Sequence, residues 1–62
     1  MPDETIAKLI HDLRSPLTVV EGFAHLLERD DDRLDHEQRM EYAQRIKAAA
    51  AEIRELLDAR RG

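Results

Sequence analysis

The sequence predicts an all-α protein, an antiparallel two-helix hairpin that homodimerises into a four-helix bundle. Apolar residues recur at alternating steps of three and four along two long segments, which is the heptad pattern of helices that pack side by side. A short acidic segment without this periodicity separates the two. The composition is rich in Ala, Leu, Glu and Arg, and aromatic residues make up only 3% of the chain, which favours helices over strands.

The first predicted helix covers about residues 3–28. Asp3 and Glu4 suit its start, as an N-cap residue and as an acid in the first turn. Its apolar stripe consists of Ile6, Leu9, Leu13, Pro16 or Leu17, Val20, Phe23 or Ala24, and Leu27. The periodicity stops after Glu28, and three consecutive aspartates then oppose the dipole of a helix C-terminus. A loop is therefore predicted over about residues 29–35.

The second predicted helix covers about residues 36–60. Asp35 and Gln38 have the spacing of a capping box at its start, and Leu34 is placed to staple onto its first turn. Its apolar stripe consists of Met40, Ala43, Ile46, Ala50, Ile53 and Leu57. Because the loop between the helices is short, they should pack antiparallel.

Length and composition exclude several classes of protein. With 62 residues and no cysteine, the chain is one small domain without disulfides or a cysteine-based zinc site. A net charge of −4 argues against nucleic-acid binding, which needs a basic patch. No apolar run approaches the roughly 18 residues of a membrane span, and no signal peptide is visible. Chains this short usually need disulfides, a metal or oligomerisation to be stable, so a homodimer is expected.

The helical pattern is interrupted near the middle of the first helix. Pro16 cannot donate a hydrogen bond to the carbonyl of Asp12 and crowds it, at a cost of about 3 kcal/mol or more. Gly22 costs roughly 1 kcal/mol relative to alanine. Selection for a stiff bundle alone would favour neither residue. Either the helix has a structural kink here, or a bend lets a partner domain reach it.

His11 lies just before this interruption, among groups that suit a nucleophilic histidine. Lys8, Arg14 and Ser15 lie one helical turn away on the same face. The two cations could stabilise anionic oxygens near the ring. The neighbouring Asp12 could hold the imidazole in one tautomer and take the proton that it loses on attacking an electrophile. A surface histidine that happens to be flanked by charges is the alternative interpretation.

An eight-residue motif begins at this histidine. It reads His11, Asp12, Leu13, Arg14, Ser15, Pro16, Leu17, Thr18. The motif resembles the H-box of sensor histidine kinases, found in their dimerisation and histidine-phosphotransfer domain (DHp, HisKA-type). The usual pattern is His, an acid, an apolar residue, Lys or Arg, Thr or Ser, Pro and Leu, and every position fits. Gly22 matches a small residue common about one turn later, and the resemblance extends over essentially the whole chain.

The resemblance implies a role for each matched residue. His11 would be the phosphoacceptor that attacks the γ-phosphate of ATP, and Asp12 the general base. Ser15 occupies the position at which many relatives have a Thr or Asn that positions water for dephosphorylating the response regulator. To these we add Arg14 and Lys8, from their spacing, as charges beside the phosphate.

The resemblance also implies partners. Pro16 would permit the helix bending used in signalling, and a receiver domain of a response regulator would dock nearby. Its expected docking surface combines the facing start of the second helix with Thr18, Val19, Gly22 and Phe23. ATP and Mg would be bound by a separate kinase catalytic domain, so the chain itself would hold no cofactor and would be part of an enzyme. A homodimer in the cytoplasm is expected, without nucleic acid or direct membrane contact, although the parent protein could be membrane-anchored.

Two other functions stay open. A dimerisation bundle without chemistry would make His11 dispensable, and a stand-alone phosphorelay protein would use it without any kinase domain. A metal site is not expected, because His11 and His25 lie about 21 Å apart along one helix and His36 belongs to the start of the other. A hydrolase built on Ser15 and His11 would lack an oxyanion hole and an orienting third group.

Overall fold

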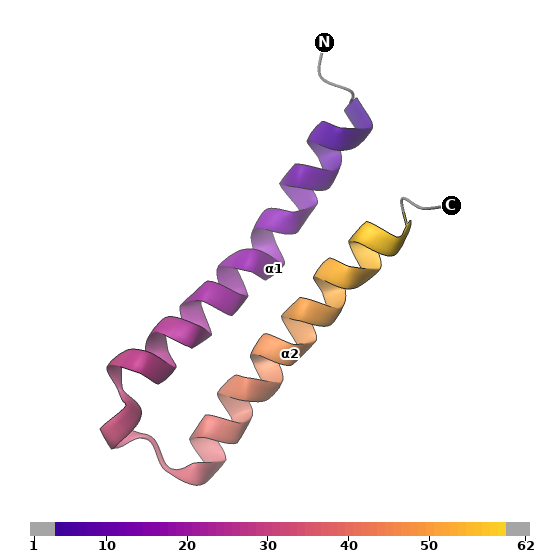
Figure 1. The fold of residues 1–62 in the computed structure, drawn as a ribbon. Coiled ribbons are helices and arrows are strands. Elements are labelled where there is room, and N and C mark those ends of the chain that lie inside the picture. Colours follow the sequence, from indigo (N-terminus) through magenta and orange to yellow (C-terminus); the bar gives the residue numbers. More distant parts are fainter. Residues whose placement is uncertain (1–3, 60–62) are drawn as a thin grey trace.

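Two long helices lie antiparallel in a computed structural model that describes residues 4–59 (Figure 1). Helix α1 spans Glu4–Arg29, the short 3-10 helix η1 spans Asp31–Arg33, and helix α2 spans His36–Ala59. The start of α1 and the end of α2 lie at one end of the molecule, and the turn lies at the other. The predicted all-α hairpin is confirmed, whereas the helix ends expected at Asp3 and Arg60 lie outside the described residues.

Helix α1 runs without interruption through Pro16. The ring removes one backbone donor and crowds the carbonyl one turn earlier, so the helix is weakened at this point. Pro16 is nevertheless buried, together with Leu34 and Ala49, while most of the described chain is exposed. Its apolar ring therefore lies in the interior of the hairpin, where its burial offsets part of the local cost.

A single layer of side chains joins the two helices. Phe23 and Tyr42 pack against each other with ring centroids 5.2 Å apart and planes tilted by 52°, a favourable arrangement for aromatic rings. The half-buried aliphatic side chains of the hairpin are Leu9, Leu13, Val20, Leu26, Leu27, Ile46, Ile53 and Leu56.

Helix α2 uses a face slightly different from the predicted stripe. Ala49 is buried and Tyr42 is half-buried, whereas Met40 and Leu57 are each 47% exposed. Alanines occupy all four positions of 48–51, so apolar residues point in every direction there. Periodicity alone then fits two neighbouring faces of α2, and packing against α1 decides between them.

The turn is held by local hydrogen bonds. The backbone N–H of Asp35 donates to Gln38 Oε1 over 3.0 Å, and the N–H of Gln38 donates to Asp35 Oδ1 over 2.8 Å. This reciprocal pair confirms the predicted capping box. The Arg39 guanidinium donates to the carbonyl of Asp31 over 2.6 Å, so the first turn of α2 also holds η1 in place.

Arg29, the last residue of α1, forms a two-pronged ion pair with the next residue, Asp30. Arg29 Nε and Nη2 each donate to a carboxylate oxygen of Asp30 over 3.0 Å. These hydrogen bonds hold the pKa of Asp30 below its ordinary value and raise that of Arg29. The charges of Arg33 and His25 act on Asp30 in the same direction. The acidic segment thus carries its own counterions.

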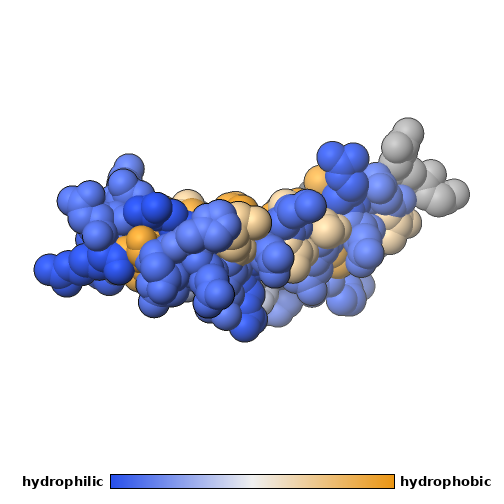
Figure 2. Space-filling model, turned by 90° about the horizontal axis from the view of Figure 1, so that it is seen from below, coloured by the Kyte–Doolittle hydropathy of each residue, from blue (hydrophilic) through white to orange (hydrophobic). Residues whose placement is uncertain are grey.

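The hairpin is too thin to enclose a core. Its radius of gyration is 14.7 Å, against about 10.6 Å for a compact chain of this length. It exposes 5386 Å², whereas a compact protein of this mass exposes about 4,100 Å². The face seen in Figure 2 is mostly hydrophilic, with apolar side chains visible between the polar ones along the molecule. Each helix therefore has apolar surface that the other does not cover.

The capping box should contribute measurably to stability. We expect Asp35→Ala to lower the free energy of unfolding by about 1 kcal/mol, because the N–H of Gln38 loses its acceptor. Urea denaturation at one fixed protein concentration measures this. The matched control is Asp32→Ala, since Asp32 lies exposed in η1. Equal loss of stability in both variants would contradict the assigned role.

Candidate functional site

His11 projects from α1 on the side away from α2. A helix turns by about 100° per residue, so His11 lies about 140° around the axis from Pro16, which faces α2. The imidazole is exposed, and it makes no hydrogen bond or ion pair with any residue of the described range 4–59. Its ring nitrogens are therefore accessible to a reagent that approaches from solvent.

Asp12 lies on a different side of α1 from His11, at the edge of the hairpin next to α2. Its carboxylate is half-buried, and its Oδ2 lies 2.9 Å from Lys8 Nζ. Both side chains line a shallow groove beside the end of α2, with Leu56 and Ala59 on the facing wall. The spacing of Lys8 and His11 predicts a lysine beside the phosphate, whereas in the structure Lys8 forms a pair with Asp12. The i, i+4 spacing of an acid and a base was the signal that could have revealed it.

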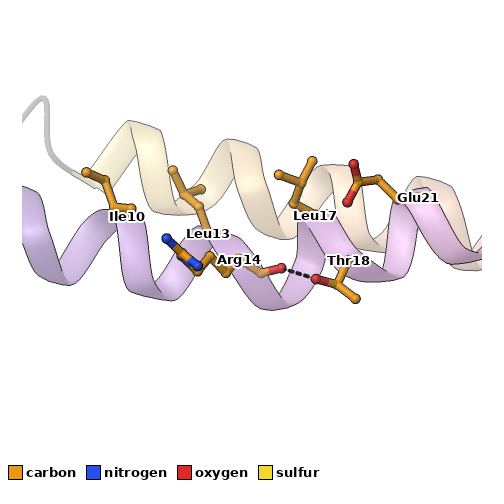
Figure 3. Close-up of a pocket in the computed structure, with 6 residues that line it drawn as sticks. All are labelled: Ile10, Leu13, Arg14, Leu17, Thr18 and Glu21. Atoms are coloured by element: carbon orange, nitrogen blue, oxygen red, sulfur yellow. Dashed lines mark hydrogen bonds between the residues drawn. The ribbon is translucent and has the colours of Figure 1, made fainter.

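Arg14 lies on the opposite side of His11 from Lys8. Together with Glu21 and Thr18 it lines a shallow groove over α1 (Figure 3). The Thr18 hydroxyl donates to the carbonyl of Arg14 over 2.8 Å, which adds a bond to the backbone next to Pro16. The guanidinium of Arg14 has no ion-pair partner within the described part of the chain.

Ser15 is exposed one turn after His11 and about 40° around the helix from it. The structure thus brings four of the predicted residues to one patch of α1, which we call the His11 patch. Its members are Lys8, His11, Arg14 and Ser15. Asp12 borders this patch through its ion pair with Lys8. The patch combines an accessible imidazole with two cations and a hydroxyl, which are groups able to bind an anionic group.

The four residues expected to dock a regulator are not equally accessible. Thr18, Val19 and Gly22 are exposed, whereas Phe23 is half-buried because its ring packs on Tyr42. Phe23 therefore offers the least surface to a partner. Val19 forms a shallow groove with Arg45, Ala48, Ala49 and Glu52 of α2. These residues lie in the middle of α2, beyond the start of the helix that is expected to face the regulator.

Gly22 has no structural role within the hairpin. A Cβ built at this position meets no atom within 4 Å, and the backbone φ is not positive. Glycine in a helix interior costs roughly 1 kcal/mol relative to alanine. Neither close packing nor backbone conformation inside the hairpin therefore requires glycine here.

A second surface of the hairpin is apolar and exposed. Figure 3 shows Ile10, Leu13 and Leu17 pointing to the same side of α1, and Ile10 and Leu17 are 51% and 48% exposed. At about 100° per residue, a stripe of α2 lies on this same side of the hairpin. We call the combined surface the exposed apolar face. Its exposed members are Ile6, Ile10, Leu17, Ala50 and Leu57, and the half-buried Leu13 and Ile53 border it.

Two further properties concern only the described residues. Within residues 4–59, no three His, Asp or Glu side chains come together in a way that could hold a metal ion. Over the same range, neither helix combines the length and the apolar character needed to cross a membrane.

Comparison with known families and proteins gives one match. Residues 3–59 match the family described as the His Kinase A (phospho-acceptor) domain, HisKA. The matched segment contains both helices, the turn and the His11 patch. No curated protein and no solved structure is similar enough to the chain to count as a match.

Proposed function

Because the chain belongs to the His Kinase A (phospho-acceptor) domain family, we propose that His11 accepts a phosphoryl group from ATP and passes it to an aspartate of a response regulator. The observation that carries this proposal is the exposed imidazole of His11, at the head of the H-box motif and between two cations. As the phosphoacceptor of a sensor histidine kinase, the chain presents the nucleophile. ATP and its Mg²⁺ are bound by a separate catalytic domain.

The proposed transfer begins at the ring of His11. The lone pair of one ring nitrogen forms a bond to the γ-phosphorus, while the bond from that phosphorus to the bridging oxygen breaks and its electrons leave with ADP. The proton of the other ring nitrogen passes to the carboxylate of Asp12. Arg14 faces the incoming phosphoryl oxygens and offsets part of their negative charge. An aspartate of the regulator then attacks the phosphorus, the electrons of the P–N bond return to the ring, and the ring takes back a proton from Asp12.

Ser15 fits a role in dephosphorylation of the response regulator. Its hydroxyl is exposed one turn beyond His11 and can both donate and accept a hydrogen bond. We infer that it positions a water molecule against the phosphorylated regulator. A hydroxyl is shorter than the amide of an asparagine, so the water must lie close to α1.

A second copy of this chain is the proposed cover of the exposed apolar face. The face extends along both helices and leaves large aliphatic side chains about half exposed, an arrangement that monomeric proteins avoid. Two hairpins that pack through it form a four-helix bundle with a closed core. The His11 patch points away from α2 and stays accessible in such a bundle.

Gly22 supports the proposed docking surface. Nothing in the hairpin requires a glycine there, and Gly22 lies between the exposed Thr18 and the turn, on a side of α1 that neither α2 nor the exposed apolar face occupies. A missing side chain lets a partner approach the backbone closely. We therefore infer that the receiver domain packs against α1 at this residue.

Phosphotransfer tests the function directly. Wild type and His11→Gln are incubated with a kinase ATP-binding domain and ATP, or with a phosphorylated receiver domain. We expect acid-labile, base-stable phosphate on wild type and none on His11→Gln, whereas His25→Gln keeps the label. Label from the receiver domain alone would favour a stand-alone phosphorelay protein. No label on a dimeric wild type would favour a bundle without chemistry.

Charge placed in the exposed apolar face should dissociate the dimer. We expect Leu17→Glu to weaken dimerisation roughly 100-fold or more, because each copy would bury a carboxylate. Analytical ultracentrifugation should give twice the monomer mass of 7.2 kDa for wild type. Val19→Glu is the matched control, since Val19 is an exposed aliphatic residue on the other side of the hairpin. A monomeric wild type, or equal effects of the two variants, would contradict the dimer.

A methyl group at Gly22 should stabilise the fold and weaken docking of the receiver domain. We expect Gly22→Ala to raise the free energy of unfolding by about 1 kcal/mol and to slow transfer from phosphorylated His11 to a receiver domain severalfold. Acceptance of phosphate by His11 serves as the internal control and should be unchanged. A stabilised variant that transfers at the wild-type rate would rule out close docking at this position.

A further inference from the structure

We propose that Lys8 exchanges its ion-pair partner when His11 is phosphorylated. In the unphosphorylated protein its ammonium binds the carboxylate of Asp12, and in the phosphorylated protein it binds the phosphoryl group on His11. This inference rests on the proposed function, because it requires phosphate on His11. It assigns to Lys8 a positioning role, since the lysine acts by holding and then releasing Asp12.

The helix places Lys8 between the two groups. His11 is three residues after Lys8 and Asp12 is four residues after it, and both spacings bring side chains within reach on a helix. At about 100° per residue, His11 lies about 60° to one side of Lys8 and Asp12 about 40° to the other. The flexible four-carbon stem of lysine can therefore swing its ammonium from one to the other without any change of the backbone.

No other described cation of α1 lies one helical turn, three or four residues, from both Asp12 and His11. The groove that holds the pair is completed by uncharged residues, namely Thr5, Leu9, Leu56 and Ala59. Arg14 is also one turn from His11, but it lies about 160° around the helix from Asp12 and cannot pair with both. Within the described chain, Lys8 is thus the cation shared by the proposed nucleophile and the proposed base.

The charges favour the exchange in the stated direction. The side chain of Lys8 is 76% exposed and that of Asp12 is 32% exposed, and an ion pair in such a setting is weak and easily opened. A phosphoryl group carries up to about two negative charges, against one on a carboxylate, and has three strong acceptor oxygens. As the phosphoryl group arrives, the ammonium moves to it, and the carboxylate is released at the stage when the imidazole must lose its proton.

Phosphoramidate, a small phosphoryl donor, tests this without a kinase. The lone pair of a His11 ring nitrogen attacks the phosphorus, the P–N bond of phosphoramidate breaks, and its electron pair leaves with ammonia. The imidazole proton goes to Asp12 and then to water. The full chain is used with His25→Gln and His36→Gln, so that His11 is the only histidine left of three. Phosphorus NMR then follows formation of phosphohistidine.

The side-chain NMR signals of lysine report the exchange, because the chain has two lysines, Lys8 and Lys47. On phosphorylation we expect the Lys8 signal to move and the Lys47 signal to stay. In Asp12→Asn, the Lys8 signal should start from a different position and reach the same final one. We also expect Lys8→Ala to accept phosphate roughly two- to fivefold more slowly, the size of one exposed charge contact. Lys8→Arg should stay within about twofold of the parent, and Lys47→Ala should match it.

The outcomes separate the two proposals. Phosphohistidine with an unmoved Lys8 signal, or equal rates for Lys8→Ala and Lys47→Ala, would overturn the exchange and leave His11 as phosphoacceptor. Absence of phosphohistidine in a folded, dimeric protein would overturn both.

Discussion

Helices α1 and α2 share one layer of side chains, and the other properties of the molecule depend on how little that layer encloses. Each helix can bury only one stripe against its neighbour, so a second apolar stripe on each is left at the surface. The two exposed stripes fall on the same side because the helices are antiparallel. A hairpin built in this way has apolar surface that the proposed second copy would cover, and a polar outer surface that remains accessible.

The position of the His11 patch follows from the way in which apolar and polar residues share the surface of α1. Apolar residues take the inward side and the side of the exposed apolar face, and the remaining side is available to Lys8, His11, Arg14 and Ser15. These side chains need no tertiary contact to be placed, since a regular helix sets their spacing. The patch therefore depends on the integrity of α1 more than on details of the hairpin interior.

Two residues of α1 are costly for a helix, and they have different explanations. Pro16 is buried in the hairpin, so part of its local cost is offset by packing. Gly22 has open space around it, and its cost is not offset anywhere in the hairpin. A residue that weakens the fold without helping it to pack is typical of a site used by a partner. The difference between the two residues therefore supports the proposed docking surface at Gly22.

The sequence by itself determined those features that depend on neighbours within one or two turns. They include the two helices, the capping box of Asp35 and Gln38, and the H-box motif at His11. The pair of Lys8 and Asp12 belongs to the same class, because its i, i+4 spacing is set by the helix alone. Only the tertiary structure decided that Ala49 and Tyr42, and not Met40 and Leu57, face α1. The alanine-rich middle of α2 has no strongly preferred apolar side, so the choice of face rests on the fit with side chains from the other helix, which no local pattern records.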